Sequence, residues 1–192
     1  PMPGRRTLVL GAEGQLGTAL RHAFEGDATV EFAGRAKFDI TSEDSYRAVN
    51  WRNFSAVINA AAFTAVDAAE TPEGRATAWS INATAVSRLA RAAVEHSLTL
   101  VHVSSDYVFD GTAEVHFEDE VPTPLGVYGQ TKAAGDAAVA AVPKHYIVRT
   151  SWVVGEGRNF VRTMASLAAK GASPSVVDDQ WRRLSFAKDI AG

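Results

Sequence analysis

Near the start of the chain, a short apolar run leads into a cluster of three glycines and then into a helical segment. Residues 7–10 read TLVL, the glycines are Gly11, Gly14 and Gly17, and TALRHAF continues with helical spacing. Such glycines let the backbone turn tightly and approach a pyrophosphate, which then lies at the positive end of the helix. The pattern predicts the first strand, turn and helix of a dinucleotide-binding domain. A glycine-rich helix start without a ligand is the alternative.

The remainder of the chain alternates short apolar runs with segments of helical spacing. We expect strands at residues 30–32, 56–59, 99–104, 145–149 and 175–177. We expect helices at residues 79–95, 128–141 and 160–170, and a further helix with Thr41 as its N-cap. This alternation is typical of a parallel sheet with helices on both faces. The predicted fold class is therefore α/β, with a Rossmann-type doubly wound parallel sheet.

Composition excludes several classes of function. The net charge of −3 gives no reason to expect nucleic acid or an anionic membrane as a partner. Cysteine is absent, which removes disulfides and thiol nucleophiles, and the five histidines show no ligand spacing, so we expect no metal site. No apolar run approaches the ~20 residues of a membrane span, and the N-terminal sequence lacks a secretion signal pattern. We expect a soluble, cytoplasmic protein.

A hydroxyl, a phenol and an ammonium fall within one stretch of the chain, at Ser105, Tyr128 and Lys132. Tyr128 and Lys132 lie four residues apart and so share one face of a helix. A cation within about 4–6 Å favours a phenolate, so we expect Lys132 to lower the Tyr128 pKa from its usual value near 10. Tyr128 could then exchange a proton during catalysis, and Ser105 could bond the same substrate oxygen. An ordinary amphipathic helix with an exposed lysine has the same spacing.

The second predicted strand bears on the choice of cofactor. An NAD-preferring site usually has Asp or Glu at its tip, whereas this chain has Arg35. A guanidinium suits a 2′-phosphate, which favours NADPH, with NADH as the second possibility and a plain surface arginine as the alternative.

Two further groups of residues are candidates for the cofactor. Asp39 either contacts an adenine or shapes its loop. Ala60, Ala61 and Ala62, after the third strand, leave room for a flat ligand, or they serve tight packing alone.

Five segments occur in the order GAEGQLG, INAAAFTAVDAAE, HVSSDYVFDG, VYGQTKAAG and RTSWVVG. In these segments the chain resembles the extended short-chain dehydrogenase/reductases, and within them the dTDP-4-dehydrorhamnose reductase family. The resemblance implies hydride transfer from a reduced nicotinamide to the C4 ketone of dTDP-4-dehydro-L-rhamnose. It also allows a homodimer. Family chains continue past Gly192, so we expect a dinucleotide-binding domain over residues 1–171 and the beginning of a truncated substrate-binding region over residues 172–192.

The resemblance also implies roles for single residues. Tyr128 is the implied proton donor, Lys132 its electrostatic partner and a ribose ligand, and Ser105 the accompanying hydroxyl. The residues that it implies for the cofactor are Gly14, Gln15, Leu16, Asp39, Ile40, Ala60, Ala61 and Ala62, together with Tyr128 and Lys132. The glycine turn and the tip of the second strand add Gly11, Gly17 and Arg35 to the predicted cofactor residues. The residues that it implies for the sugar nucleotide are Ser105, Asp106 and Trp152.

Two rival functions stay open at this point. An epimerase or a 4,6-dehydratase of the same superfamily is the first, although a dehydratase needs an acid pair after the hydroxyl and Asp106 is followed by Tyr107. A non-catalytic, cofactor-binding regulatory subunit of the same fold is the second. Retention of Ser105, Tyr128 and Lys132 favours the enzyme.

Overall fold

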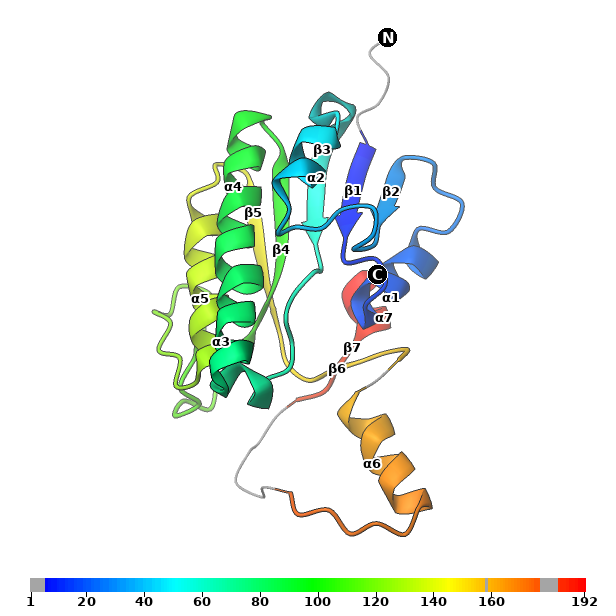
Figure 1. The fold of residues 1–192 in the computed structure, drawn as a ribbon, viewed down its shortest axis with the longest axis vertical. Helices are drawn as coiled ribbons and strands as arrows, with labels where there is room; N and C mark the ends of the chain where they lie inside the picture. Colours follow the sequence, from blue (N-terminus) through cyan, green and yellow to red (C-terminus); the bar gives the residue numbers. More distant parts are fainter. Residues whose placement is uncertain (1–5, 158, 177–182) are drawn as a thin grey trace.

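The computed structural model describes residues 6–157, 159–176 and 183–192. At its centre is a five-stranded sheet in the order β2-β1-β3-β4-β5, in which every neighbouring pair is parallel (Figure 1). The strands are β1 (Arg6–Leu10), β2 (Val30–Ala33), β3 (Phe54–Asn59), β4 (Thr99–Ser105) and β5 (His145–Thr150). Because the chain passes from β1 outward to β2 and then back to β3, the strand order reverses between β1 and β3.

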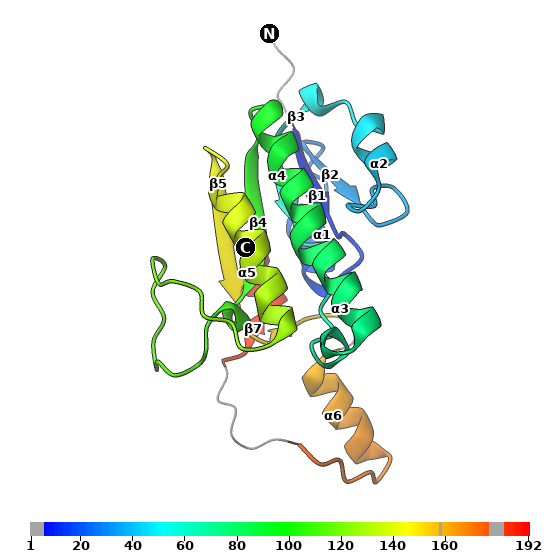
Figure 2. The same cartoon turned by 60° about the vertical axis from the view of Figure 1, so that its left-hand side comes forward.

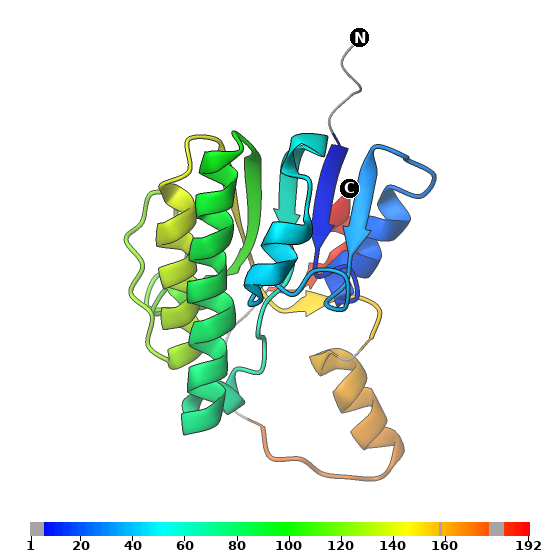
Figure 3. The ribbon, with the colours of Figure 1, turned by 45° about the horizontal axis from the view of Figure 1, so that its top comes forward.

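Helices cover both faces of this sheet, as Figures 1 and 3 show. One layer comprises α2 (Glu43–Ala48), α3 (Pro72–Ala78), a π-helical segment (Trp79–Ala85), α4 (Val86–Glu95) and α5 (Val127–Ala140). The opposite layer comprises α1 (Gln15–Ala23) and α7 (Ala187–Ala191). The predicted doubly wound α/β fold is thereby confirmed.

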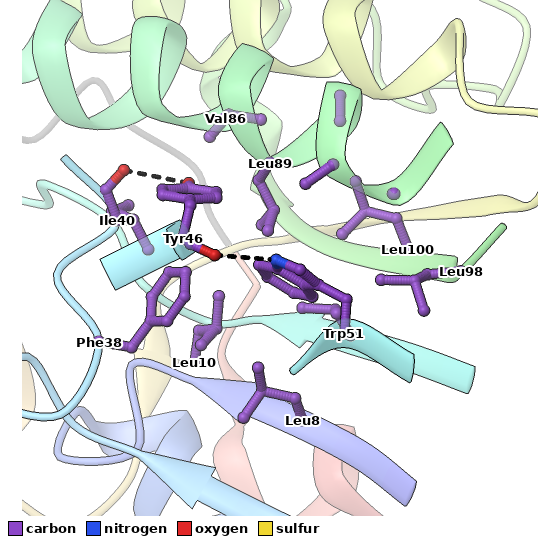
Figure 4. Packing of buried hydrophobic residues seen from close by; sticks show 14 of the residues in the cluster. Leu8, Leu10, Phe38, Ile40, Tyr46, Trp51, Val86, Leu89, Leu98 and Leu100 are labelled. Carbon is purple, nitrogen blue, oxygen red and sulfur yellow. Dashed lines mark hydrogen bonds between the residues drawn. The ribbon is translucent and has the colours of Figure 1, made fainter. Parts of the chain in front are cut away.

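The larger core lies between the sheet and the layer that contains α4 and α5. Its aromatic part packs Phe38 and Trp51 edge-on, with ring centroids 6.0 Å apart, and places Tyr46 4.9 Å from Phe38 (Figure 4). The Tyr46 hydroxyl donates to the Ile40 carbonyl at 3.1 Å, and the Trp51 indole donates to the Tyr46 carbonyl at 3.0 Å. These bonds fix the loop between β2 and α2, which forms one wall of the site described below.

The segment after β5 leaves the sheet. A second, two-stranded sheet pairs β6 (Val153–Val154) with β7 (Ser185–Phe186) in parallel, and β7 leads into α7 beside α1. Between these strands, α6 (Phe160–Ala169) lies beyond the carboxyl ends of the sheet strands, apart from both helix layers (Figures 1 and 2). None of its residues is buried.

Three local predictions differ from the structure. Thr41 is not the N-cap of α2, because Ser42 takes that position, while Thr41 bonds Asp39 through its N–H at 2.9 Å and its hydroxyl at 2.6 Å. The helix predicted from residue 79 begins at Pro72, because the Thr71 hydroxyl caps it by accepting from the Gly74 N–H at 3.1 Å. The strand predicted at 175–177 is wrong at residues 175 and 176, which are irregular, and residue 177 lies outside the described residues.

Candidate active site

The site forms where the sheet strands end. All carboxyl ends of a parallel sheet meet at one edge, and ligands of such folds bind where the strand order reverses. Here this edge brings together Gly11 after β1, Ala60 after β3, Ser105 at the end of β4 and Thr150 at the end of β5. Residues far apart in the sequence therefore line one continuous region.

The glycine turn forms a close-fitting backbone cradle at this edge. Gly11 has a φ of +75°, and a Cβ there would lie 2.5 Å from the Ala61 nitrogen. A Cβ on Gly17 would collide with the Gly11 carbonyl oxygen and the Ala12 backbone. Gly14 is open by comparison, and it stands at the N-cap of α1 without any side-chain cap bond. The free backbone N–H groups at this helix end fit the pyrophosphate of the dinucleotide predicted from the sequence.

A first cavity of about 230 Å³ lies on one side of the turn. Predicted cofactor residues on its wall are Gly11, Gly14, Arg35, Asp39, Ile40, Ala60, Ala61 and Ala62. Asp39 also shapes its loop through Thr41, and its carboxylate accepts from the Arg35 Nε at 3.1 Å. Hydrogen bonds from Thr41 hold the Asp39 pKa below its usual value. These contacts confirm that Asp39 shapes its loop, while its contact with an adenine stays a prediction.

Sequence reasoning missed Glu13 on the same wall. The three glycines drew attention to the turn, but the side chain between them faces the tip of β2, where a Cβ on Gly34 would collide with the Glu13 carboxyl group. A carboxylate therefore does stand at the tip of β2, beside Gly34, although it comes from the turn rather than from the strand. The signal was present in the sequence as the acid within GAEG.

A second cavity of about 480 Å³ continues along the sheet edge. It shares Gly14, Ala60 and Ala62 with the first cavity. The other predicted residues on its wall are Gln15, Leu16, Ser105, Asp106, Tyr128, Lys132 and Trp152. Every predicted site residue except Gly17 thus lines one of the two cavities. Gly17 packs against the Gly11 and Ala12 backbone, and its contact with the cofactor stays a prediction.

Tyr128 stands in the first turn of α5 and is only 8% exposed. The ring of Tyr107 packs edge-on against its own, with centroids 5.4 Å apart. Burial raises the Tyr128 pKa to about 12, while the Ser105 hydroxyl beside the phenol acts in the opposite direction. The predicted lowering of this pKa is wrong. The sequence shows the lysine one turn away, but it does not show that burial favours the neutral phenol.

Lys132 is 1% exposed, which excludes the interpretation as a surface lysine. Its Nζ donates to the Val103 carbonyl at 2.7 Å and lies 3.4 Å from the His102 Nε2. Burial lowers the Lys132 pKa to about 8, and the charge of Asp136 acts against this lowering. At neutral pH the side chain is therefore still an ammonium, one helical turn from a protonated phenol.

Neighbouring contacts hold this arrangement in place. The Ser105 hydroxyl donates to the Asp106 Oδ1 and accepts from the Tyr107 N–H, both at 3.2 Å. The Glu70 Oε1 accepts from the Val127 N–H at 2.8 Å, at the start of the helix that carries Tyr128. Sequence reasoning did not give Glu70 a role, although it ends a quoted segment.

Asn82 and Gln15 join distant segments at the site. Asn82 is buried, and its amide bonds both backbone groups of Phe63 and the Thr131 hydroxyl at 2.9–3.1 Å. The Gln15 Oε1 accepts from the Gly155 N–H at 3.0 Å and the Asn159 Nδ2 at 3.2 Å. The start of α1 is thereby tied to the segment that enters α6.

Residues 6–157, 159–176 and 183–192 contain neither a candidate metal cluster nor a candidate membrane span. No group of three or more His, Cys, Asp or Glu side chains there could hold a metal ion. Within these ranges, no helix has both the length and the apolar character that crossing a membrane requires.

Comparison with known proteins identifies relatives of the whole chain. Residues 5–192 match the family described as RmlD substrate binding domain. The dTDP-4-dehydrorhamnose reductase of Mycobacterium tuberculosis is 40% identical over 99% of this chain and 65% of its own length. The corresponding enzyme of Aggregatibacter actinomycetemcomitans is 39% identical, over 97% of this chain and likewise 65% of its length. The chain therefore spans about 65% of the length of these curated relatives.

A solved structure shows the same fold with a bound dinucleotide. The dTDP-4-dehydrorhamnose reductase of Bacillus anthracis, crystallised with NADP, superposes with a TM-score of 0.88 at 34% identity. The superposition covers 97% of this chain and 68% of that one. The glycine cradle, the Ser105–Tyr128–Lys132 cavity and these matches lead to one assignment: this chain belongs to the RmlD substrate binding domain family.

Proposed function

We propose that the chain carries the cofactor site and the catalytic residues of an NADPH-dependent dTDP-4-dehydrorhamnose reductase. The reaction would reduce the C4 ketone of dTDP-4-dehydro-L-rhamnose to the alcohol of dTDP-L-rhamnose. One observation carries the proposal: Ser105, Tyr128 and Lys132 line one cavity that is continuous with the glycine cradle. Such a phenol, ammonium and hydroxyl beside a dinucleotide site suit the reduction of a carbonyl group.

The residues of the first cavity suit a dinucleotide with a 2′-phosphate. The N–H groups at the start of α1 would hold the pyrophosphate, and Arg35 would hold the additional phosphate. When bound, NADPH supplies the hydride. NADH is the second candidate, because Asp39 already pairs with Arg35 and Glu13 lines the same wall. Carboxylates on the wall of this cavity weaken the attraction of Arg35 for a phosphate.

Tyr128 would donate the proton that the reduced carbonyl oxygen requires. A pKa near 12 keeps the phenol protonated at neutral pH, so the residue begins turnover as an acid. The Ser105 hydroxyl, at the end of β4, would orient the substrate oxygen toward the phenol. The Lys132 ammonium would stabilise the phenolate that remains after proton donation. Water is largely excluded from both groups, which strengthens their mutual attraction.

The candidate substrate residues line the second cavity. Asp106 and Trp152 would contact the sugar nucleotide, and Tyr107 on the same cavity wall joins them as a candidate. The division into a cofactor domain at 1–171 and a substrate region from 172 stays a prediction. Because Tyr107 rather than a second acid follows Asp106, elimination of water by a dehydratase is disfavoured.

The test is loss of reduced-nicotinamide absorbance when the 192-residue chain meets NADPH and dTDP-4-dehydro-L-rhamnose. Turnover that produces dTDP-L-rhamnose would support the proposal. NADPH binding without turnover would contradict the proposal for these 192 residues alone, and it would favour either the cofactor-binding regulatory subunit or an enzyme that needs more of the substrate region than residues 172–192. Interconversion of the sugar without net consumption of NADPH would favour the epimerase.

A further inference from the structure

A cluster of polar and charged side chains lies behind Lys132, on the side away from the cavity. We call Asn59, His102, Lys132, Asp136 and Arg149 the buried cluster. Four of them are between 0% and 3% exposed, and only Arg149, with 21% of its side chain exposed, reaches the surface. They come from β3, β4, α5 and β5. The function proposed above uses Lys132 alone, so the other four need a separate explanation.

The protonation of His102 follows from its neighbours. The Asn59 Oδ1 accepts from the Ala61 N–H at 3.2 Å, so the Nδ2 of Asn59 is the atom that lies 3.0 Å from the His102 Nδ1. Because this amide nitrogen donates, Nδ1 accepts and the ring proton is on Nε2. Burial and the charge of Lys132 hold the His102 pKa well below its usual value, so the ring is neutral.

His102 therefore cannot accept a hydrogen bond from Lys132. Its Nε2–H lies 3.4 Å from the Lys132 Nζ, so two donors face each other in a buried space. The same Nε2 lies 3.8 Å from the Asp136 Oδ1, an oxygen without a hydrogen-bond partner. The negative charge of the Asp136 carboxylate is therefore what compensates for the two facing donors, the His102 Nε2–H and the Lys132 ammonium.

Asp136 stands between two cations. Its Oδ2 accepts from the Arg149 Nε at 3.2 Å, and its charge opposes the lowering of the Lys132 pKa. Burial raises the pKa of Asp136 itself. The ionisable groups around Lys132 are thus His102 on β4, Tyr128 and Asp136 on its own helix, and Arg149 on β5 behind Asp136. A buried charge whose partner is removed is strongly destabilised.

We propose that Asp136 is a positioning residue, whose carboxylate keeps Lys132 cationic and so helps to hold the ammonium against the Val103 carbonyl at the edge of the catalytic cavity. The proposal deepens the function proposed above, since the cationic Lys132 is what stabilises the Tyr128 phenolate. The charge on Lys132 can nevertheless be measured without any turnover. A failure of this proposal is therefore distinguishable from a failure of the proposed reaction.

The direct test is NMR titration of the 192-residue chain labelled with ¹³C at the lysine Cε, with the Lys132 signal assigned by its loss in Lys132→Met. In the wild type, the Lys132 signal should titrate near pH 8. In Asp136→Asn, the midpoint should fall by about one pH unit or more, because the ammonium loses a nearby anion. Asp136→Glu, which restores a carboxylate, should recover most of the difference. Asp44→Asn, at a side chain that is 90% exposed, is the matched control and should change nothing.

An unchanged Lys132 midpoint in a folded Asp136→Asn variant would overturn the proposal. If that variant does not fold, the wild-type chain labelled at the aspartate Cγ decides the matter. The proposal requires an ionised Asp136 at neutral pH, so an Asp136 signal that is protonated at pH 7 would also overturn it. In a turnover assay, the alkaline fall of kcat should shift to lower pH in Asp136→Asn by the same amount as the Lys132 midpoint.

Discussion

Burial acts on the phenol and the amine of the site in a way that suits one direction of proton transfer. It favours the neutral form of both groups, which places the Tyr128 pKa near 12 and the Lys132 pKa near 8. Below about pH 8 the pair therefore exists as a neutral phenol beside an ammonium. This is the charge state that a proton donor with an electrostatic partner requires.

Replacement of the phenol by a phenyl ring tests this assignment. In Tyr128→Phe we expect kcat to fall by at least about 100-fold, since general acid catalysis typically contributes that much. The ring that packs against Tyr107 is retained, so the dissociation constant for NADPH should stay within a few-fold of the wild type. Stopped-flow absorbance gives kcat and fluorescence titration gives the binding constant. A variant with near-normal kcat would show that Tyr128 is not the donor.

The cofactor preference depends on Arg35. Its side chain is 76% exposed at the first cavity, so removing it leaves the core unchanged. In Arg35→Ala we expect NADPH to bind about tenfold more weakly or worse, with little change for NADH, because a charge-assisted contact to the 2′-phosphate is lost. Lys37→Ala, a nearby cation that pairs with Glu31 away from this cavity, is the control. Equal losses for both cofactors would contradict the role given to Arg35.

At the residue scale, motifs could predict which side chains meet but not their chemical state. Ser105, Tyr128, Lys132 and Arg35 all line the cavities that their motifs imply. Their pKa values depend on burial and on neighbours such as Asp136, which no spacing in the sequence reveals. Glu13 was overlooked because the glycines around it dominate the pattern.

At the scale of elements, the glycine turn has two roles, close backbone packing at Gly17 and room for the cofactor at Gly14, and single substitutions can test each role separately. Gly17→Ala places a Cβ against the Gly11 and Ala12 backbone, and we expect it to destabilise the fold by about 2 kcal/mol or more. Gly14→Ala meets only the Gly11 oxygen, at 3.5 Å, so its stability should stay within about 1 kcal/mol of the wild type. Its methyl group would nevertheless project where both cavities meet and should weaken NADPH binding by about tenfold.

Urea denaturation and fluorescence titration of the two variants separate these effects. The expected pattern is a stable Gly14→Ala protein that binds NADPH poorly and an unstable Gly17→Ala protein. Equal stability of the two variants would contradict the packing role of Gly17, and wild-type NADPH affinity in Gly14→Ala would contradict the cradle.

The elements that the sequence predicts well are those with long, local signals. The strands of the central sheet and the helices α4 and α5 are marked by apolar runs and by helical periodicity. The pairing of β6 with β7 is different, because these two-residue strands lie about 30 positions apart and carry no periodic pattern. The start of α3 is marked by Thr71 as N-cap and Pro72 as first residue, a signal that the spacing of apolar residues does not contain.

At the scale of the whole molecule, the chain leaves the sheet after β5 and returns with α7 to the layer that contains α1. Ile190 and Ala191 of α7 pack with Leu16 and Leu20 of α1, so residues near the end of the chain help to fix the helix that carries the cradle. The buried Lys132 adds an opposing contribution at this scale. An ion in the core costs stability, and that cost depends on pH in a way that can be calculated.

The unfolded Lys132 holds its proton up to about pH 10.5, whereas the folded one loses it near pH 8. Between these values the unfolded state binds more protons, so the free energy of unfolding should rise with pH, by about 1 kcal/mol per pH unit. Below about pH 7 this group adds no slope, because both states are protonated. Tyr128, with its raised pKa, would act in the opposite direction only above about pH 10.

Urea unfolding of the wild type and of Lys132→Met between pH 7.5 and pH 9.5 isolates this contribution, since the other ionisable groups are common to both proteins. We expect the wild-type stability to rise relative to the variant across this window, by a total of about 1–2 kcal/mol. Parallel curves would mean that Lys132 titrates alike in both states. The net lowering of the Lys132 pKa by burial would then be contradicted.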